Sequence, residues 1–214
     1  MLLYYITDRT QFPGDEKARQ LALLDKVEEA ARCGVDFVQL RERDLLAGEL
    51  EILCREAVRI VRAQRNENQN SITRLLINSR TDVALACDAD GVHLRSDDIS
   101  ASQVRSLWAQ AGCPSRALVG VSCHSVAGVA RAASERADFA VFAPVFEKKD
   151  AANAHPAGLS GLREACQLSI PVLALGGITR ENARSCLDAG AAGVAGIRLF
   201  QENEIAEVVR ELRS

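Results

Sequence analysis

A short phrase in which the end of a helix runs directly into an apolar strand recurs along this chain. It reads Ala31-Arg-Cys-Gly-Val-Asp-Phe-Val38, then Ser134-Glu-Arg-Ala-Asp-Phe-Ala-Val141, then Leu187-Asp-Ala-Gly-Ala-Ala-Gly-Val194. Strand-like and helix-like segments alternate about eight times at roughly 25-residue spacing. Apolar runs this short suit parallel strands that are covered on both faces. The repetition predicts an α/β fold, a single (β/α)8 TIM barrel with parallel strands over residues 1–214. A doubly wound open sheet is the alternative.

Apolar runs and turn residues place the expected elements. Strands are expected at 2–7, 34–41, 75–78, 91–94, 118–122 and 139–142, with the last two inside 172–200. Helices are expected at 17–33, 45–63, 80–87, 100–111, 126–136, 160–167, 180–189 and 205–212, and loops at 65–73 and 143–159. No linker or domain boundary interrupts this pattern.

Composition narrows the ligand to a small molecule. The formal net charge is -3 and aromatic residues make up 4%, so the chain has neither a basic face nor a stacking platform for nucleic acid. The first residues lack a basic segment and a cleavage site, and no apolar run reaches the roughly 18 residues needed to span a bilayer. We therefore expect a cytoplasmic protein with no nucleic-acid or membrane partner. The sequence leaves the oligomeric state open, a homo-oligomer included.

Cysteine usage agrees with a reducing compartment. The 7 cysteines are scattered, odd in number and without a Cys-x-x-Cys pair. Neither a disulfide framework nor a zinc site is indicated, and we expect most of them to be small core residues.

The last two expected strands end in glycine. Gly176 and Gly177 end one of them, and Gly196, followed by Ile197, ends the other. Glycine lets backbone N–H groups approach a ligand, and a helix that starts at once after Gly176-Gly177 would direct its positive end at the same place. The pattern predicts a phosphate site built from these four residues, which we call the glycine cup, with Gly158 as a further contributor.

Polar residues follow the other expected strands. Function in a barrel lies at the carboxyl ends of its strands. The polar residues there are Thr7, Asp8, Gln39, Arg41, Arg43, Asn78, Ser79, Arg80, Arg95, Asp97, Asp98, Ser122 and His124, followed by Lys148 and Lys149. Cations and amides crowd the early strands and acids follow the fourth, which predicts a site for an anion and a metal.

The same strand ends carry a set of motifs in a fixed order. They read Tyr5-Ile-Thr-Asp8, Val38-Gln-Leu-Arg-Glu-Arg-Asp44, Leu76-Ile-Asn-Ser-Arg80, Asp90-Gly-Val-His-Leu94, Gly120-Val-Ser-Cys-His124, Pro144-Val-Phe146 and Leu175-Gly-Gly-Ile178. In one register from first strand to last, they resemble the thiamine phosphate synthase and TenI family. Family synthases join hydroxymethylpyrimidine diphosphate to thiazole phosphate and release pyrophosphate with Mg²⁺. TenI members aromatise the thiazole phosphate tautomer.

The resemblance implies a diphosphate site after the second and third strands. Gln39, Arg41 and Arg43 match a Gln-x-Arg-x-Lys pattern that holds the diphosphate, with Arg43 in place of lysine. Two guanidinium groups can grip phosphate oxygens bidentately. The alternative is that Arg41 or Arg43 pairs with Glu42, Asp44 or a neighbouring helix. Asn78 matches an asparagine that contacts the pyrimidine substrate, and its alternative role is that of a turn residue.

The resemblance also implies a magnesium site, with one departure. Ser79 stands where synthases have an aspartate ligand; a serine hydroxyl can bind Mg²⁺, but it removes one negative charge. Asp98 keeps the second acidic position, with Asp97 beside it as a substitute. The alternative is that these acids cap the helix ahead of Ser100. Arg95 replaces a glycine and would either fill or narrow the anion site.

A proton carrier is expected after the fifth strand. Ser122 and His124 match the family's Ser-x-His, and an imidazole that titrates near neutrality suits the movement of a proton on a thiazole carbon. A Ser-His nucleophile pair is not expected, because alternating positions point to opposite sides. We expect His93 to be a hydrogen-bonded structural residue and His155 a solvated loop residue.

The loop after the sixth strand departs from the synthase pattern as well. Its Thr-x-Thr-Lys clamp is replaced by Glu147-Lys-Lys-Asp150, which lacks both hydroxyls. Lys148 matches the family lysine and Lys149 lies beside it, so a charged lid over a phosphate is retained. The alternative is a solvated loop.

Three functions of different classes follow from the resemblance. The first is a synthase-type transferase, in which Mg²⁺ on Asp98, together with Arg41, Arg43 and Lys148, stabilises the leaving pyrophosphate. The second is a TenI-like tautomerase, which needs only the glycine cup and a proton carrier and requires no metal. The third is a non-catalytic protein that binds thiazole or thiamine phosphate and reports it to a partner. A generic phosphate-binding barrel such as a sugar-phosphate epimerase is compatible with the fold alone.

Overall fold

Eight parallel strands close into a barrel in the computed structural model, which describes residues 1–67, 72–147 and 156–214. Each strand pairs with the next along the chain and β1 pairs with β8, so the sheet has no open edge. The strands are β1 (Leu2–Ile6), β2 (Phe37–Leu40), β3 (Arg74–Asn78), β4 (Gly91–Leu94), β5 (Leu118–Cys123), β6 (Phe139–Phe142), β7 (Val172–Ala174) and β8 (Gly193–Gly196). The barrel prediction is confirmed, and the open sheet is wrong.

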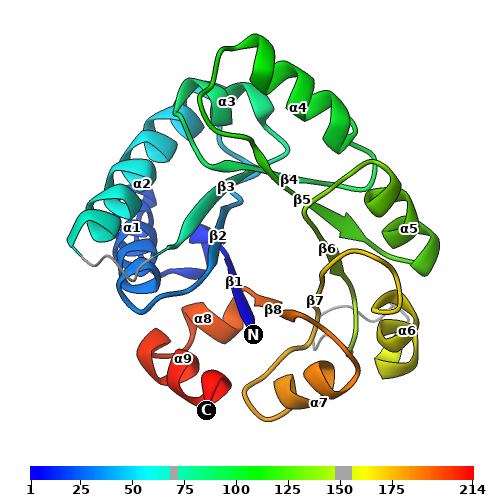
Figure 1. Cartoon of the computed structure of the whole chain (residues 1–214). Helices are drawn as coiled ribbons and strands as arrows, with labels where there is room; N and C mark the ends of the chain where they lie inside the picture. Colours follow the sequence, from blue (N-terminus) through cyan, green and yellow to red (C-terminus); the bar gives the residue numbers. More distant parts are fainter. Residues whose placement is uncertain (68–71, 148–155) are drawn as a thin grey trace.

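The helices form a ring around this barrel (Figure 1). They are the short 3-10 helix η1 (Arg9–Gln11), α1 (Glu16–Arg32), α2 (Ala47–Glu67), α3 (Thr81–Ala86), α4 (Ala101–Gln110), α5 (Val126–Ser134), α6 (Gly158–Ala165), α7 (Ala183–Asp188), α8 (Arg198–Gln201) and α9 (Ile205–Arg213). Among the described residues, no helix combines the length and apolar character needed to cross a membrane.

Most helix boundaries differ from the prediction by a few residues, and contacts in the structure explain two of the differences. The loop expected from residue 65 begins later, because Arg65 stays in α2 and its Nε donates to the Thr73 carbonyl at 2.7 Å. Helix α7 starts at Ala183 and does not follow the glycines at once. A turn intervenes, in which the Thr179 N–H donates to Asn182 Oδ1 at 2.8 Å. The expectation that the positive end of this helix directly follows Gly176-Gly177 is therefore wrong.

Aromatic rings fill the amino-terminal half of the barrel interior. Tyr4 stands edge-on to Phe37 and Phe139, at centroid distances of 5.7 and 5.5 Å. Phe37 and Phe139 stack on each other at 5.0 Å. Gly120 makes room for them, because a Cβ there would lie 2.4 Å from the Phe139 ring. The interior is therefore a packed core and not a pore, and function in such barrels lies at the carboxyl ends of the strands.

Three aspartates hold the amino-terminal ends of the strands in register. Each lies directly before an even-numbered strand, and its Oδ2 accepts a hydrogen bond from an N–H near the start of the preceding strand. The pairs are Asp36 with Leu3 (2.8 Å), Asp90 with Leu75 (2.8 Å) and Asp138 with Val119 (2.7 Å). Asp36 and Asp138 belong to the phrase that recurs in the sequence, which therefore encodes a repeated clamp between neighbouring strands.

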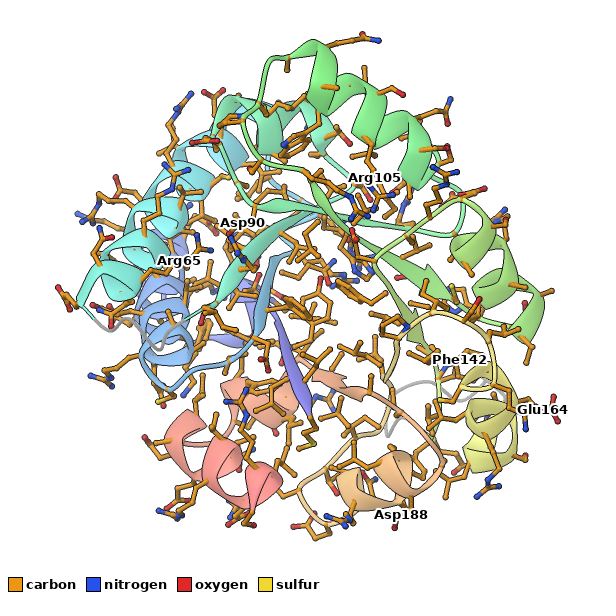
Figure 2. The ribbon with its side chains drawn as sticks, viewed as in Figure 1. Arg65, Asp90, Arg105, Phe142, Glu164 and Asp188 are labelled. Carbon is orange, nitrogen blue, oxygen red and sulfur yellow. The ribbon has the colours of Figure 1, made fainter. Side chains whose placement is uncertain are left out.

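Arginines from helices, a strand and a loop neutralise these clamps. Asp36 pairs with Arg213, Asp90 with Arg65 and Arg74, and Asp138 with Arg105 and Arg116. Figure 2 shows Arg65 close to Asp90, between α2 and the barrel. Each carboxylate thus has a hydrogen-bond donor for its oxygen and a guanidinium group that balances its charge, so these contacts stabilise the barrel.

Replacing one clamp should weaken the fold. Asp138→Ala leaves the Val119 N–H without its acceptor and Arg105 without its carboxylate, and we expect a loss of about 1–3 kcal/mol in the free energy of unfolding. Urea denaturation followed by circular dichroism measures it. The control is Asp25→Ala, an exposed acid of α1 without an ion pair to any described residue, which should change stability by less than about 0.5 kcal/mol. Equal effects of the two substitutions would contradict the clamp.

Candidate active site

A continuous chain of hydrogen bonds crosses the carboxyl ends of β2, β3 and β4. The Gln39 side-chain amide donates to Asn78 Oδ1 at 2.8 Å. The Asn78 amide lies 3.3 Å from the Ser79 Oγ, and the Ser79 hydroxyl donates to Asp98 Oδ2 at 2.6 Å. Four residues predicted from the sequence are thus brought together on neighbouring strand ends.

Gln39 contributes an acceptor that has no protein partner. Its side chain is 1% exposed, and its Oε1 accepts no hydrogen bond from any described residue. A buried acceptor of this kind costs free energy unless a ligand or water donates to it. The Gln39 carbonyl oxygen is therefore available to an N–H or O–H donor of a ligand or of water.

Asp98 is surrounded by donors. Its Oδ2 also accepts the Arg95 N–H at 2.8 Å, and its Oδ1 lies 3.3 Å from both Nε and Nη2 of Arg95. The residue that caps α4 is Ser100, in a capping box with Gln103, so the capping alternative for Asp98 is wrong. Ser79 has φ 59°, a conformation that aspartate and asparagine tolerate better than most residues.

The oxygen atoms of Ser79 and Asp98 suit a metal ion that also binds the phosphate oxygens of a ligand. Ser79 Oγ and Asp98 Oδ2 are hard oxygen atoms 2.6 Å apart, and Mg²⁺ is commonly bound by one or two carboxylates plus substrate phosphates. Asp97 stands apart, with a side chain 71% exposed and its Oδ1 3.5 Å from the Arg95 Nε. Within residues 1–67, 72–147 and 156–214, no three His, Cys, Asp or Glu side chains gather into a metal site. The residues fit Mg²⁺ only with oxygens from a ligand.

Arg41 and Arg43 form no ion pair with any described residue. Arg41 is half-buried and Arg43 is exposed. Burial, and then the like charge of Arg43, lowers the pKa of Arg41. The carboxylates of Glu42 and Asp44 bind Arg9 instead, so their proposed pairing with Arg41 or Arg43 is wrong. We call Arg41 and Arg43 the arginine site: two guanidinium groups beside the Gln39–Asn78 surface that are available to an anion.

Ser122 is held by His93, not by His124. The His93 Nε2 lies 2.8 Å from the Ser122 Oγ, and its Nδ1 lies 3.1 Å from the Tyr4 hydroxyl. Burial raises the pKa of Tyr4, so the phenol keeps its proton, and the buried hydroxyl is satisfied when it donates to Nδ1. His93 Nε2–H then donates to Ser122, which leaves the Ser122 proton for a ligand. The expected structural role of His93 is confirmed, and it also orients Ser122.

His124 lies on the surface of the site. Its side chain is exposed, and its Nδ1 is 2.9 Å from the Ala143 carbonyl oxygen. A carbonyl only accepts, so Nδ1 carries a proton, and Nε2 of the neutral ring is free to take one. This arrangement suits a proton carrier.

The glycines of the cup are required by neighbouring backbone. Gly176 and Gly177 have φ of 99° and 65°. A Cβ at Gly176 would lie 2.8 Å from Pro144, and one at Gly177 would lie 2.6 Å from the Glu147 carbonyl oxygen. The expected reason for these glycines was space for a ligand. The structure corrects this, because the loop after β6 occupies that space.

Backbone N–H groups remain available at this end of the barrel. Those of Gly177, Ile178 and Ile197 donate to no other described residue. Ile197 caps α8, which begins directly after β8, and Gly158 is the first residue of α6, with φ 66°. N–H groups that converge at strand ends and helix starts suit a phosphate. Lys148 and Lys149, the predicted lid, and His155 lie outside the described residues.

The closed parallel barrel, with a helix after each strand, defines a TIM barrel, and the glycine cup after β7 and β8 and the guanidinium pair after β2 lie at its carboxyl-terminal face. The family model for thiamine monophosphate synthase matches residues 3–200, and the chain belongs to this family. It is 43% identical over 195 residues to a putative thiamine-phosphate synthase of Geobacter sulfurreducens, covering 90% of this chain and 83% of the relative. It is 34% identical over 216 residues to the thiamine-phosphate synthase of Syntrophomonas wolfei, covering 99% and 94%.

A solved structure agrees with these relatives. Thiamine phosphate pyrophosphorylase from Pyrococcus furiosus superposes with a TM-score of 0.79 at 28% identity, covering 99% of this chain and 93% of that one. The family resemblance inferred from the strand-end motifs is confirmed.

Three residues of the site escaped the sequence analysis. Arg9 follows the predicted strand-end residues Thr7 and Asp8 directly, and its position there was the only signal. Tyr4 was placed only within the first expected strand, and His93 was given a structural role without its contacts. Tyr4 and His93 lie 89 positions apart, and His93 and Ser122 lie 29 positions apart. The hydrophobic periodicity of the sequence does not reveal contacts over such separations.

Neutral His93 makes stability depend on pH. Burial is the main cause that lowers its pKa to about 3, from an unfolded value near 6.5. Between these values the unfolded chain binds a proton that the folded chain does not, so stability contributed at neutral pH is lost as pH falls from about 6.5 towards 3. Wild type should lose up to about 1.4 kcal/mol more per pH unit in this window than His93→Gln. Denaturant unfolding at several pH values measures the difference, and parallel slopes would rule it out.

Proposed function

We propose that this chain is a thiamine-phosphate synthase, joining hydroxymethylpyrimidine diphosphate to thiazole phosphate and releasing pyrophosphate. One observation supports the proposal: two separate groups at the carboxyl ends of the strands are suited to binding an anion. The arginine site follows β2, and the glycine cup follows β7 and β8. A reaction between a diphosphate and a monophosphate needs both, whereas a tautomerase that acts on one monophosphate needs only the cup.

Charge neutralisation is the main chemical task in this reaction. As pyrophosphate leaves, negative charge grows on its oxygens, and Arg41 and Arg43 meet it with guanidinium groups that have no described carboxylate partner. Asp98 and Ser79 would hold Mg²⁺, which supplies further positive charge to the phosphate oxygens when bound. Lys148 and Lys149 are proposed to close over the diphosphate.

Gln39, Ser122 and the glycine cup are proposed to orient the parts of the two substrates outside the diphosphate. Gln39 accepts a hydrogen bond from the pyrimidine substrate through its unpartnered Oε1, beside Asn78. Ser122 donates its hydroxyl proton to a substrate heteroatom, because His93 occupies its acceptor side. The thiazole phosphate binds the cup through N–H groups at Gly176, Gly177, Gly196 and Ile197, with Gly158 nearby. These groups hold both reactants in one place and so reduce the entropic part of the barrier.

A thiazole tautomerase is the second candidate, and His124 favours it. Its exposed ring, fixed through Nδ1 on the Ala143 carbonyl, can accept a proton at Nε2. The sharpest experiment incubates the protein with both synthase substrates and Mg²⁺, and separately with the thiazole tautomer alone, and identifies the products. Thiamine phosphate supports the synthase, and the aromatised thiazole alone supports the tautomerase. Retained phosphate affinity without any turnover would support the non-catalytic binder.

Restoring a carboxylate at position 79 should strengthen a synthase. Ser79→Asp adds an anionic oxygen beside Asp98, so we expect tighter Mg²⁺ binding and a higher rate of pyrophosphate release at limiting metal. Asp98→Asn should weaken both, by about tenfold or more in apparent metal affinity. A magnesium titration of thiamine phosphate formation measures these effects. Asp97→Asn is the matched comparison, because its exposed side chain contacts only Arg95 among the site residues. If Asp97→Asn alone weakens metal dependence, Asp97 is the ligand and Asp98 is not.

Removal of the exposed imidazole separates the two enzymes. His124→Ala should leave the affinity for thiazole phosphate near wild type, since the ring is not part of the glycine cup. A tautomerase should lose about 10²–10⁴ in rate, the usual worth of a positioned general base. A synthase should lose less. Assays of both reactions, with calorimetry of thiazole phosphate binding, test this, and an unchanged tautomerase rate would remove His124 from that role.

A further inference from the structure

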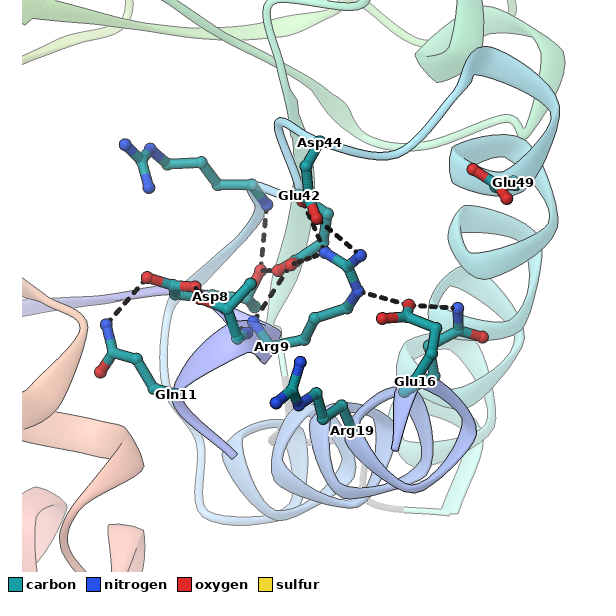
Figure 3. Close-up of polar contacts among 12 residues, drawn as sticks. Asp8, Arg9, Gln11, Glu16, Arg19, Glu42, Asp44 and Glu49 are labelled. Atoms are coloured by element: carbon teal, nitrogen blue, oxygen red, sulfur yellow. Dashed lines mark hydrogen bonds and ion pairs between the residues drawn. The ribbon is translucent and has the colours of Figure 1, made fainter. Parts of the chain in front are cut away.

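A buried arginine joins three acidic side chains next to the arginine site. Arg9, the first residue of η1, is 3% exposed. Its Nη1 and Nη2 bind the two Asp44 oxygens at 2.7 and 2.9 Å, and its Nε binds Glu16 Oε1 at 2.6 Å. Its backbone N–H and its Nη1 both donate to Glu42 Oε2, at 3.0 and 3.1 Å. Figure 3 shows Arg9 among these carboxylates.

The contacts of Arg9 separate the acidic from the basic side chains of the loop after β2. This loop reads Arg41-Glu42-Arg43-Asp44, with cations and anions alternating. Both anions bind Arg9, whereas neither cation has an ion-pair partner among the described residues. The sequence alone permits pairing within this loop, so the separation of the charges is a product of Arg9.

Thr7 extends the same network to the backbone of the arginine site. Its hydroxyl donates to Glu42 Oε1 at 2.6 Å and accepts the Arg41 N–H at 3.0 Å. Glu42 is 4% exposed and both of its oxygens are engaged. Arg9 therefore controls the direction of two carboxylates and, through Glu42 and Thr7, the backbone at Arg41.

Without Arg9, the carboxylates of Glu42 and Asp44 would be free to pair with other cations. Glu42 is buried, and a buried carboxylate without a cation is costly, so Glu42 would pair with the nearest positive group. The Asp44 side chain is 60% exposed, so its attraction to the same cations is weaker. The nearest along the chain are Arg41 and Arg43, which flank Glu42 directly. An arginine that is paired with a carboxylate must break that pair before it binds phosphate, so anion affinity falls.

We propose that Arg9 is a positioning residue for the arginine site: it holds Glu42 and Asp44 away, so that Arg41 and Arg43 meet a diphosphate without an internal carboxylate partner. The inference rests on the proposed function in one respect, that the arginine site binds the diphosphate. The direction of the pKa shifts agrees with it, since hydrogen bonding to Arg9 lowers the pKa of Asp44, and no carboxylate outweighs the burial of Arg41.

A double-mutant comparison tests the proposal with inorganic pyrophosphate as the probe. Arg9→Met is made in the wild-type chain and in a Glu42→Gln/Asp44→Asn background, where the competing charges are gone. Calorimetry should show about tenfold weaker pyrophosphate binding in the first case and less than about a twofold change in the second. In enzyme assays, KM for the diphosphate substrate should rise while KM for thiazole phosphate stays constant.

Arg19→Met is the matched control. Arg19 lies in the same region, but its Nε binds the Phe12 carbonyl at 3.1 Å and it pairs with no described carboxylate. Pyrophosphate affinity should not change in this variant.

The remaining outcomes are decisive. Equal weakening by Arg9→Met in both backgrounds, or no weakening in the wild-type chain, overturns the positioning role. If Arg9→Met fails to fold, Arg9→Lys replaces it: a point charge cannot grip both carboxylates, so binding should weaken in the wild-type chain and recover in the neutral background. Failure to recover overturns the role here too. Arg41→Met separates this inference from the proposed function: if pyrophosphate affinity survives that change, the arginine site itself is wrong, whatever Arg9 does.

Discussion

The register of the parallel barrel depends on carboxylates at the end opposite the site. Asp36, Asp90 and Asp138 each bind the N–H of the neighbouring strand, and each is neutralised by arginines from the surrounding elements. Because side chains alternate between the two faces of a strand, a slip of one residue would turn every inward side chain outward. The pairing of Asn78 with His93 across β3 and β4 exists only in this register. The clamps at one end of the barrel thus determine which groups meet at the other.

At the carboxyl ends, the main physical problem is to keep opposite charges apart. The proposed diphosphate needs cations at this site, yet the loops there are rich in acids. Arg9 binds Glu42 and Asp44, and Arg95 lies on Asp98. The first pairing leaves Arg41 and Arg43 available, whereas the second places a guanidinium on the carboxylate that would hold Mg²⁺. The proposed binding of Mg²⁺ at Asp98 would therefore have to compete with Arg95 and to recruit oxygens from the ligand.

Neutral polar groups complete the site from the barrel core. Tyr4 and His93 are buried among aromatic rings, and they set the direction of the Ser122 hydroxyl. Burial keeps both groups uncharged, so this relay orients a hydrogen bond without adding charge. With the arginine site and the glycine cup, it forms the surface to which we assign the two substrates of the proposed reaction.

The order of elements and the strand ends were determined by the sequence, because hydrophobic periodicity and glycine position are local properties. Residues 91–94 and 139–142 were predicted as strands and form β4 and β6. The motifs at the strand ends likewise identified the family and placed Gln39, Asn78, Ser79 and Asp98 in one site. Partner choice was decided only by the tertiary structure. Arg9 lies 33 and 35 positions from Glu42 and Asp44, and the parallel pairing of β1 with β2 brings these residues together. The same holds for Gly177, where the loop after β6 leaves no room for a side chain. Such contacts depend on register and rotamer, which no local pattern encodes.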